Sequence, residues 1–278
     1  MDKKRTIRLV LLQWPGASAA DNRLSAQLLS LILPPDAGTE TIQVPLAEGI
    51  VAGGGNQPVV LQQIAETQAI LAAKHPDRVI TAGGGSVISV APVDYLSGKY
   101  GEHLGVLWLG THPDIADPST SSHLSEMVAG NLLGQGNPAL AVHQPLLPRQ
   151  LMYAGLNEPL RPMDQAVTSL GIRHATAEDI ASDSQSVLDW MAAEHLTQIA
   201  VHFDLDVLTR ADFRSILPAQ SYTEPADANT GELALRQVVR LMQDISAQAD
   251  LVGFSIAAPL PQDALNLRQA LRDISIFN

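Results

Sequence analysis

Apolar residues recur along this chain in two alternating patterns. Short apolar runs rich in β-branched residues predict strands covered on both faces of a sheet. Longer segments with apolar residues three or four positions apart predict amphipathic helices. Strands are predicted at residues 6–14, 41–44, 78–82, 105–109, 151–156, 171–175, 199–203 and 251–257. Helices are predicted at residues 23–33, 58–74, 89–96, 121–133, 163–170, 184–195, 231–247 and 261–272.

Strands and helices alternate from end to end, and no repeat, low-complexity tract or linker divides them. This alternation predicts one doubly wound α/β domain over residues 1–278, with a mostly parallel central sheet. Ligands of such sheets bind beyond the carboxyl ends of the strands. Segments 83–86, 110–114 and 204–206 lie at such ends. The long irregular segment 208–230 is also typical of a functional loop.

Composition narrows the function further. The chain has 17 Lys and Arg against 29 Asp and Glu, and aromatic residues make up only 4%. An acidic chain poor in aromatic residues argues against binding nucleic acid or an anionic membrane surface. The lack of cysteine excludes disulfides, thiolate metal sites and cysteine nucleophiles. The chain contains no run of 18 apolar residues, which a membrane-spanning helix would need. We therefore expect a cytoplasmic protein.

Two carboxylates follow the predicted strand at residues 199–203. Asp204 and Asp206 share one side of a strand, because side chains two positions apart point the same way. Carboxylates at the end of a buried strand need a cation or several hydrogen-bond donors. A metal site is therefore one interpretation of this pair. The alternative is a strand-to-loop junction in which each Asp caps backbone amides.

His112 and Asp114 follow the predicted strand at residues 105–109 and add a nitrogen and an oxygen ligand. Together with Asp204 and Asp206 they suit Mn²⁺, Mg²⁺ or Zn²⁺. His123 is a candidate proton shuttle, with a surface or capping role as the alternative. His202 alternates with Phe203 and is interpreted as a structural residue that points away from the Asp side. The segment 83–86 is interpreted as a tight turn rather than a phosphate cradle, because it lacks a nucleotide-binding spacing.

These motifs resemble those of the arginase/agmatinase/formiminoglutamase (ureohydrolase) family. The resembling segments are Gly-Gly-Gly-Ser-Val at 83–87, Gly-Thr-His-Pro-Asp at 110–114, Asp-Leu-Asp at 204–206 and Ile-Ala-Ala at 256–258, in family order over nearly the whole chain. The resemblance implies a three-layer α/β/α fold and assembly as trimers or hexamers. It also implies hydrolysis of guanidino or amidine C–N bonds by a hydroxide that bridges two Mn²⁺ ions.

Carried over by position, the resemblance makes His112, Asp114, Asp204 and Asp206 metal ligands. Three other family positions are degenerate: Ser86 stands for a His ligand, Gly110 for a bridging Asp, and Ala258 for the carboxylate that holds the cationic substrate. His123 could compensate for a missing histidine at Ser125. The remaining ligands cannot build a full dinuclear cluster, so one ion is favoured over two, and a metal-free site is the other outcome.

Three hypotheses about function remain open at this point. The first is a pseudoenzyme-like ureohydrolase with weak or lost activity on guanidino substrates. The second is a mononuclear hydrolase of an amide or amidine that uses His112, Asp204 and Asp206. The third is a non-catalytic binding or assembly partner. The sequence leaves open whether the protein is an enzyme.

Overall fold

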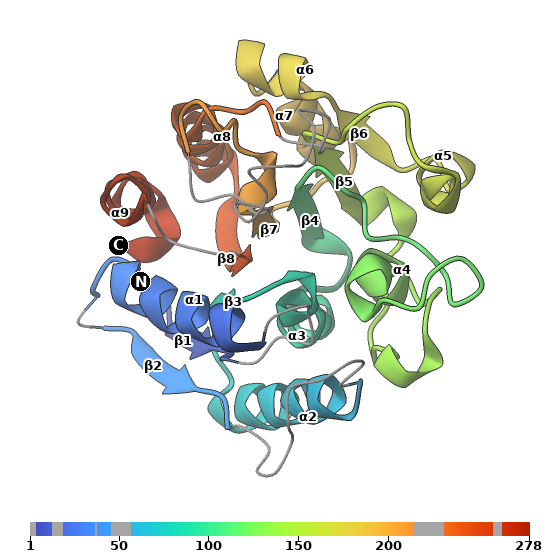
Figure 1. Cartoon of the computed structure of the whole chain (residues 1–278). Helices are drawn as coiled ribbons and strands as arrows, with labels where there is room; N and C mark the ends of the chain where they lie inside the picture. The colour runs from blue at the N-terminus through green and yellow to red at the C-terminus, as the bar shows by residue number, and fades with distance from the viewer. Residues whose placement is uncertain (1–3, 13–18, 37, 46–56, 214–230, 258–262) are drawn as a thin grey trace.

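The computed structural model describes residues 4–12, 19–36, 38–45, 57–213, 231–257 and 263–278, with the side chains of residues 19–25 also outside the description. Within these ranges eight parallel strands form one sheet in the order β2-β1-β3-β8-β7-β4-β5-β6 (Figure 1). The strands are β1 (Thr6–Val10), β2 (Glu40–Gln43), β3 (Arg78–Gly83), β4 (Leu104–Leu109), β5 (Leu151–Ala154), β6 (Arg173–Ala175), β7 (Gln198–Asp204) and β8 (Asp250–Ala257).

Helices cover both faces of this sheet. They are α1 (Ala19–Ile32), α2 (Gln57–Lys74), α3 (Val90–Tyr100), α4 (Val128–Leu132), α5 (Ala166–Ser169), α6 (Ala177–Ser182), α7 (Gln185–Ala193), α8 (Leu235–Gln248) and α9 (Ala264–Arg272). Side chains of α1, α6, α7, α8 and α9 share one buried cluster, and those of α2, α3, α4 and α5 share the other. The predicted three-layer α/β/α architecture with a parallel sheet is confirmed.

Alternation along the central strands explains these two clusters. All six residues of β4 are buried. Leu107 and Leu109 pack in the cluster on the α8 side, while Val106 and Trp108 pack in the cluster on the α3 side. A strand with helices on both faces has no solvent face, so its sequence runs apolar without interruption. This is why the central strands could be predicted from the sequence.

Several predicted boundaries are wrong. The strand predicted at residues 6–14 ends as β1 at Val10. The helix predicted from residue 231 begins at Leu235, because Leu233 first pairs with Leu208 in an isolated parallel bridge.

The helix predicted at residues 121–133 is also wrong at its start. It is a 3₁₀ turn, Leu124–Met127, followed by the short α4. Before that turn, the Ser121 hydroxyl donates a hydrogen bond to Glu126 and accepts one from the backbone N–H of His123. Such side-chain bonds compete with helical backbone bonds.

None of the helices in the described ranges is long and apolar enough to cross a bilayer.

Candidate functional site

The candidate site lies at the carboxyl ends of β4 and β7, neighbours near the middle of the sheet (Figure 1). Leu109 of β4 pairs with Phe203 of β7, so the segments after both strands begin side by side. After β7 the chain enters a 3₁₀ turn, Leu205–Val207. Parallel pairing therefore brings the segment at 110–114 against the Asp-Leu-Asp segment, as the sequence predicted.

Asp206 is held from several directions by the segment after β4. Its Oδ1 accepts a hydrogen bond from the backbone N–H of Thr111 at 3.1 Å, and its Oδ2 accepts one from the Thr111 hydroxyl at 2.5 Å. His112 Nδ1 lies 3.3 Å from Asp206 Oδ2 and 2.9 Å from the Thr111 hydroxyl. The hydrogen bond with Asp206 raises the pKa of His112, while burial opposes this rise. The protein's own donors therefore already engage both oxygens of Asp206.

Asp204 turns its carboxylate back onto its own chain. Its Oδ1 accepts a hydrogen bond from the backbone N–H of Asp206 at 2.9 Å, as an N-cap of the following turn. Burial, reinforced by the negative charge of Asp206, raises the pKa of Asp204 well above its usual range. Asp204 therefore caps a backbone amide, as expected for an ordinary strand-to-loop junction, which was the alternative to a metal site.

Asp114 completes the predicted set from a buried position with φ 48°. Burial raises its pKa to about 7, although a hydrogen bond with the Ser86 side chain and the charge of His112 oppose the rise. Burial without a cation favours the neutral acid. The negative charge of Asp206 also raises the pKa of Asp114, and the charge of Asp114 raises the pKa of Asp204. The four predicted ligands therefore lie in one region, at the carboxyl ends of the central strands.

Two glycines of the family motifs differ in how far packing requires them. A Cβ added to Gly83 would lie 2.5 Å from Ile88 Cγ2 and 3.2 Å from the Leu11 carbonyl oxygen, so close packing fixes a glycine there. This contact supports the tight-turn interpretation of residues 83–86. A Cβ added to Gly110 would meet no atom closer than 3.6 Å. Packing thus leaves room for a Cβ at the position that the family resemblance assigns to a bridging Asp.

The predicted orientation of His202 is wrong. Its ring stacks on Trp108 with centroids 3.7 Å apart, and its Nδ1 lies 2.8 Å from the Ser89 hydroxyl. His202 lies on the face of β7 that also carries Asp204, because side chains two positions apart on a strand point to the same face. The two-residue period of a strand therefore already predicted this orientation. Burial lowers the pKa of His202 to about 3, so it is a neutral, buried residue beneath the site. Its interpretation as structural agrees with this position.

Of the two remaining predicted positions, the structure describes His123 and leaves Ala258 outside the described residues. His123 is exposed, and its recorded hydrogen bonds are those of its backbone, which precedes the 3₁₀ turn. Ala258 lies outside the described residues, as does most of the segment 208–230. Ser125, the other residue considered on the helix segment, is partly buried.

Two residues near the site, Thr111 and Arg161, could not be predicted from the sequence. Thr111 holds Asp206, yet a single threonine between a glycine and a histidine carries no pattern. Arg161 donates to Asp164 at 2.6 Å and lies 3.4 Å from Glu126, and its positive charge also acts on His112 and Asp114. This arginine lies in the segment after β5, and only the fold brings it near the carboxylates.

This donor set does not fit a dinuclear metal centre. Among the described residues no three His, Asp or Glu side chains are arranged so that they could hold one ion. Asp206 is engaged by Thr111, Asp204 caps a backbone amide, and Asp114 is buried with Ser86 as its partner. Ser86 and Gly110 supply neither the imidazole nor the bridging carboxylate that the resemblance calls for.

The protein is thus a three-layer α/β/α domain with a parallel sheet, and its carboxylate-rich site lies at the carboxyl ends of the central strands. Residues 15–263 match the Arginase family, and the chain belongs to that family.

Solved structures agree in fold. The arginase of Entamoeba histolytica in complex with L-ornithine superposes with a TM-score of 0.80 at 17% identity, over 100% of this chain and 99% of that one. The arginase of Bacillus caldovelox gives 0.80 at 16% identity, over 99% of each chain. The formimidoylglutamase of Bacillus subtilis gives 0.71 at 14% identity, over 98% of this chain and 87% of that one. No curated protein sequence matches this chain significantly.

Proposed function

We propose that this chain is an arginase-family protein in which the metal-dependent hydrolysis of guanidino C–N bonds is lost or reduced by orders of magnitude. One observation carries the proposal: the remaining carboxylates are engaged by the protein's own donors, with both oxygens of Asp206 bound to Thr111. A bridging ion would have to displace these bonds. It would also lack the carboxylate that Gly110 does not supply.

The expected size of the loss follows from the missing groups. Removing one preorganised electrostatic element from a hydrolytic site commonly costs about 10²–10³ in rate. Gly110 and Ser86 each remove one such element, so their combined loss is larger than either alone. Against ordinary turnover numbers of about 1–10³ s⁻¹, we expect turnover below roughly 10⁻² s⁻¹.

Release of urea or formamide tests this proposal. The purified protein is incubated with Mn²⁺ and then with arginine, agmatine or formiminoglutamate, and product is measured over hours. Asp206→Asn is the matched control, because activity that survives this change comes from a contaminant. Turnover at ordinary enzyme rates that Asp206→Asn abolishes would refute the proposal.

A second candidate is a mononuclear hydrolase that uses His112, Asp204 and Asp206. It is favoured by the 3.3 Å approach of His112 Nδ1 to Asp206, which brings two of its three donors together. Elemental analysis after purification with Mn²⁺ separates the candidates. One tightly held equivalent of Mn²⁺ that Asp206→Asn removes supports the mononuclear site, and substoichiometric metal excludes it.

Assembly and location stay predictions. A trimer or hexamer, as the family resemblance implies, is measured by light scattering. A role as a non-catalytic partner is tested by co-purification, and a cytoplasmic location by cell fractionation.

A further inference from the structure

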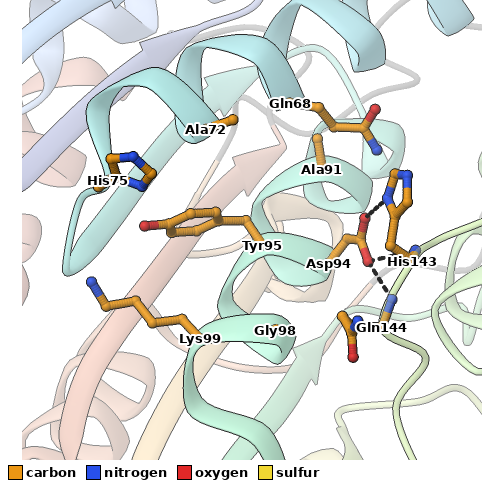
Figure 2. Close-up of a pocket in the computed structure, with 10 residues that line it drawn as sticks. All are labelled: Gln68, Ala72, His75, Ala91, Asp94, Tyr95, Gly98, Lys99, His143 and Gln144. Atoms are coloured by element: carbon orange, nitrogen blue, oxygen red, sulfur yellow. Dashed lines mark hydrogen bonds and ion pairs between the residues drawn. The ribbon is translucent and has the colours of Figure 1, made fainter.

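A pocket separate from the carboxylate site lies between α2 and α3, closed at one end by the loop that contains His143 and Gln144 (Figure 2). Its volume is about 510 Å³, within the range of small-molecule sites. Ala72, Ala91 and Gly98 contribute apolar surface to its walls. The pocket therefore offers an apolar middle with polar side chains at its two ends.

A histidine with a fixed orientation stands at one end. Asp94, whose side chain is only 5% exposed, accepts hydrogen bonds from the backbone N–H groups of His143 and Gln144, both at 2.8 Å. Its other oxygen lies 2.9 Å from His143 Nδ1 (Figure 2). A carboxylate accepts only, so Nδ1 carries the proton of this hydrogen bond, and in the tautomer protonated at Nδ1 alone Nε2 is an acceptor. The imidazole edge that Asp94 does not occupy is thus prepared to accept an O–H or N–H from a ligand.

Positive charge stands at the other end. Lys99 Nζ donates to the Pro76 carbonyl at 2.8 Å and to Asp77 at 2.7 Å, so one of its three N–H bonds is left for a ligand. The Tyr95 hydroxyl also donates to the Pro76 carbonyl, which fixes its ring across the pocket beside His75 (Figure 2). An aromatic face suits stacking with a planar apolar ring, and the lysine beside it suits an anionic group attached to that ring.

The charges of the lining residues favour an anion over a cation. Asp94 is the one carboxylate among the lining residues that the structure describes, and three donors already compensate it. Lys99 brings a positive charge, and neither His75 nor His143 brings a negative one. A guanidino compound, the ligand chemistry of the family site, would find no anionic partner here.

We propose that this pocket binds a small planar organic acid, with its carboxylate at Lys99 and a hydroxyl at Nε2 of His143. The apolar body of the ligand lies between α2 and α3, against the Tyr95 ring. The proposal is independent of the family site, because no residue of the carboxylate cluster lines the pocket.

Three hydroxy acids of increasing length test the site: glycolate, 4-hydroxybenzoate and 4-hydroxycinnamate. Binding to the full chain is measured by saturation-transfer NMR and by titration. We expect at least one of the two aromatic acids to bind with a dissociation constant below about 1 mM, a modest affinity for ligands of this size. The corresponding amide, which keeps the shape and loses the charge, is expected to bind about ten-fold more weakly.

Two substitutions in the pocket test whether the acids bind there. Lys99→Met and His143→Gln are each expected to weaken binding about five- to ten-fold, because each removes one hydrogen-bond partner of the ligand. Asp204→Asn is the control at the family site and should leave the affinity unchanged. Circular dichroism and thermal unfolding confirm that the variants are folded. No binding of any acid at about 10 mM, far above the expected constant, overturns the proposal, and so does equal binding of acid and amide or a loss caused by Asp204→Asn.

Discussion

Gly110→Asp is the substitution that most directly tests how this site relates to its family. A Cβ at residue 110 would lie 3.7 Å from Asp204 Cβ and 3.7 Å from Trp108 Nε1, both ordinary contacts. The Cβ of the new side chain therefore sits at ordinary van der Waals distances from its neighbours, directly beside Asp204. Its effect should come from charge rather than from overpacking.

The magnitude follows from that position. Without a metal, two carboxylates about 5 Å apart at an effective dielectric constant of about 20 repel by about 3 kcal/mol, less whatever protonation relieves. Gly110→Asp should thus be about 1–3 kcal/mol less stable in a chelator at pH 8 than Gly110→Asn, its uncharged isostere. A Mn²⁺ ion that binds with a dissociation constant of about 10 μM would return about 2.7 kcal/mol at about 1 mM metal, which is roughly 5 °C in Tm.

The assay is thermal unfolding in chelator and in Mn²⁺, with elemental analysis of the same samples. The series comprises the unsubstituted protein, Gly110→Ala, Gly110→Asn, Gly110→Asp, and Gly110→Asp combined with Ser86→His. Only the two variants with the new carboxylate should gain stability from Mn²⁺, and the double variant should gain more. If Mn²⁺ stabilises the unsubstituted protein as much, its site already holds the ion; if no variant gains, residue 110 does not correspond to the bridging position.

Three further predictions concern the groups around the site. Burial raises the pKa of Asp114 from 3.8 to about 7, so between these pH values the folded state holds a proton that the unfolded chain has released. The free energy of unfolding should therefore fall by at most about 4 kcal/mol as the pH rises from about 4 to 7. Urea titrations at several pH values measure this slope, and Asp114→Asn should flatten it. Gly83→Ala would place a Cβ 2.5 Å from Ile88 Cγ2, and a loss of about 1–3 kcal/mol in the same assay is expected, whereas a neutral result would show that this turn adjusts freely. Ser89→Ala removes the partner of buried His202 and should cost about 1–3 kcal/mol without shifting the Mn²⁺ response; an unchanged midpoint would mean that another group replaces the hydroxyl.

The sequence predicted most of the fold because burial on two faces leaves a readable pattern. The run Leu104–Leu109 is entirely buried and has no polar face, so its assignment as a central strand needed no other information. The start of α8 could not be predicted in this way. It depends on the bridge between Leu208 and Leu233, two residues that are adjacent only after the chain has folded.

The carboxylate site could also be predicted only in part from the sequence. The convergence of the segments after β4 and β7 followed from parallel pairing, and the four predicted residues do share one region. What they do there could not be predicted, because it depends on Thr111 and Ser86, whose hydroxyls become partners of Asp206 and Asp114. Short hydroxyl side chains occur everywhere in a sequence, and only the fold shows which of them faces a buried carboxylate.

The fold and the family chemistry are separable in this protein because they depend on different residues. The sheet is stabilised by apolar side chains that pack on its two faces, below the edge where the carboxylates lie. Those faces bury surface whether or not an ion binds at the edge. The buried carboxylates at the carboxyl ends of the strands accept hydrogen bonds from Thr111, the N–H of Asp206 and Ser86, although burial still raises the pKa of Asp204 and Asp114. If residue 110 corresponds to the family's bridging position, as we propose, a glycine there is tolerable for folding and withholds a carboxylate that two-metal hydrolysis requires. A TM-score of 0.80 to an arginase therefore carries the architecture to this chain, and the reaction has to be tested separately.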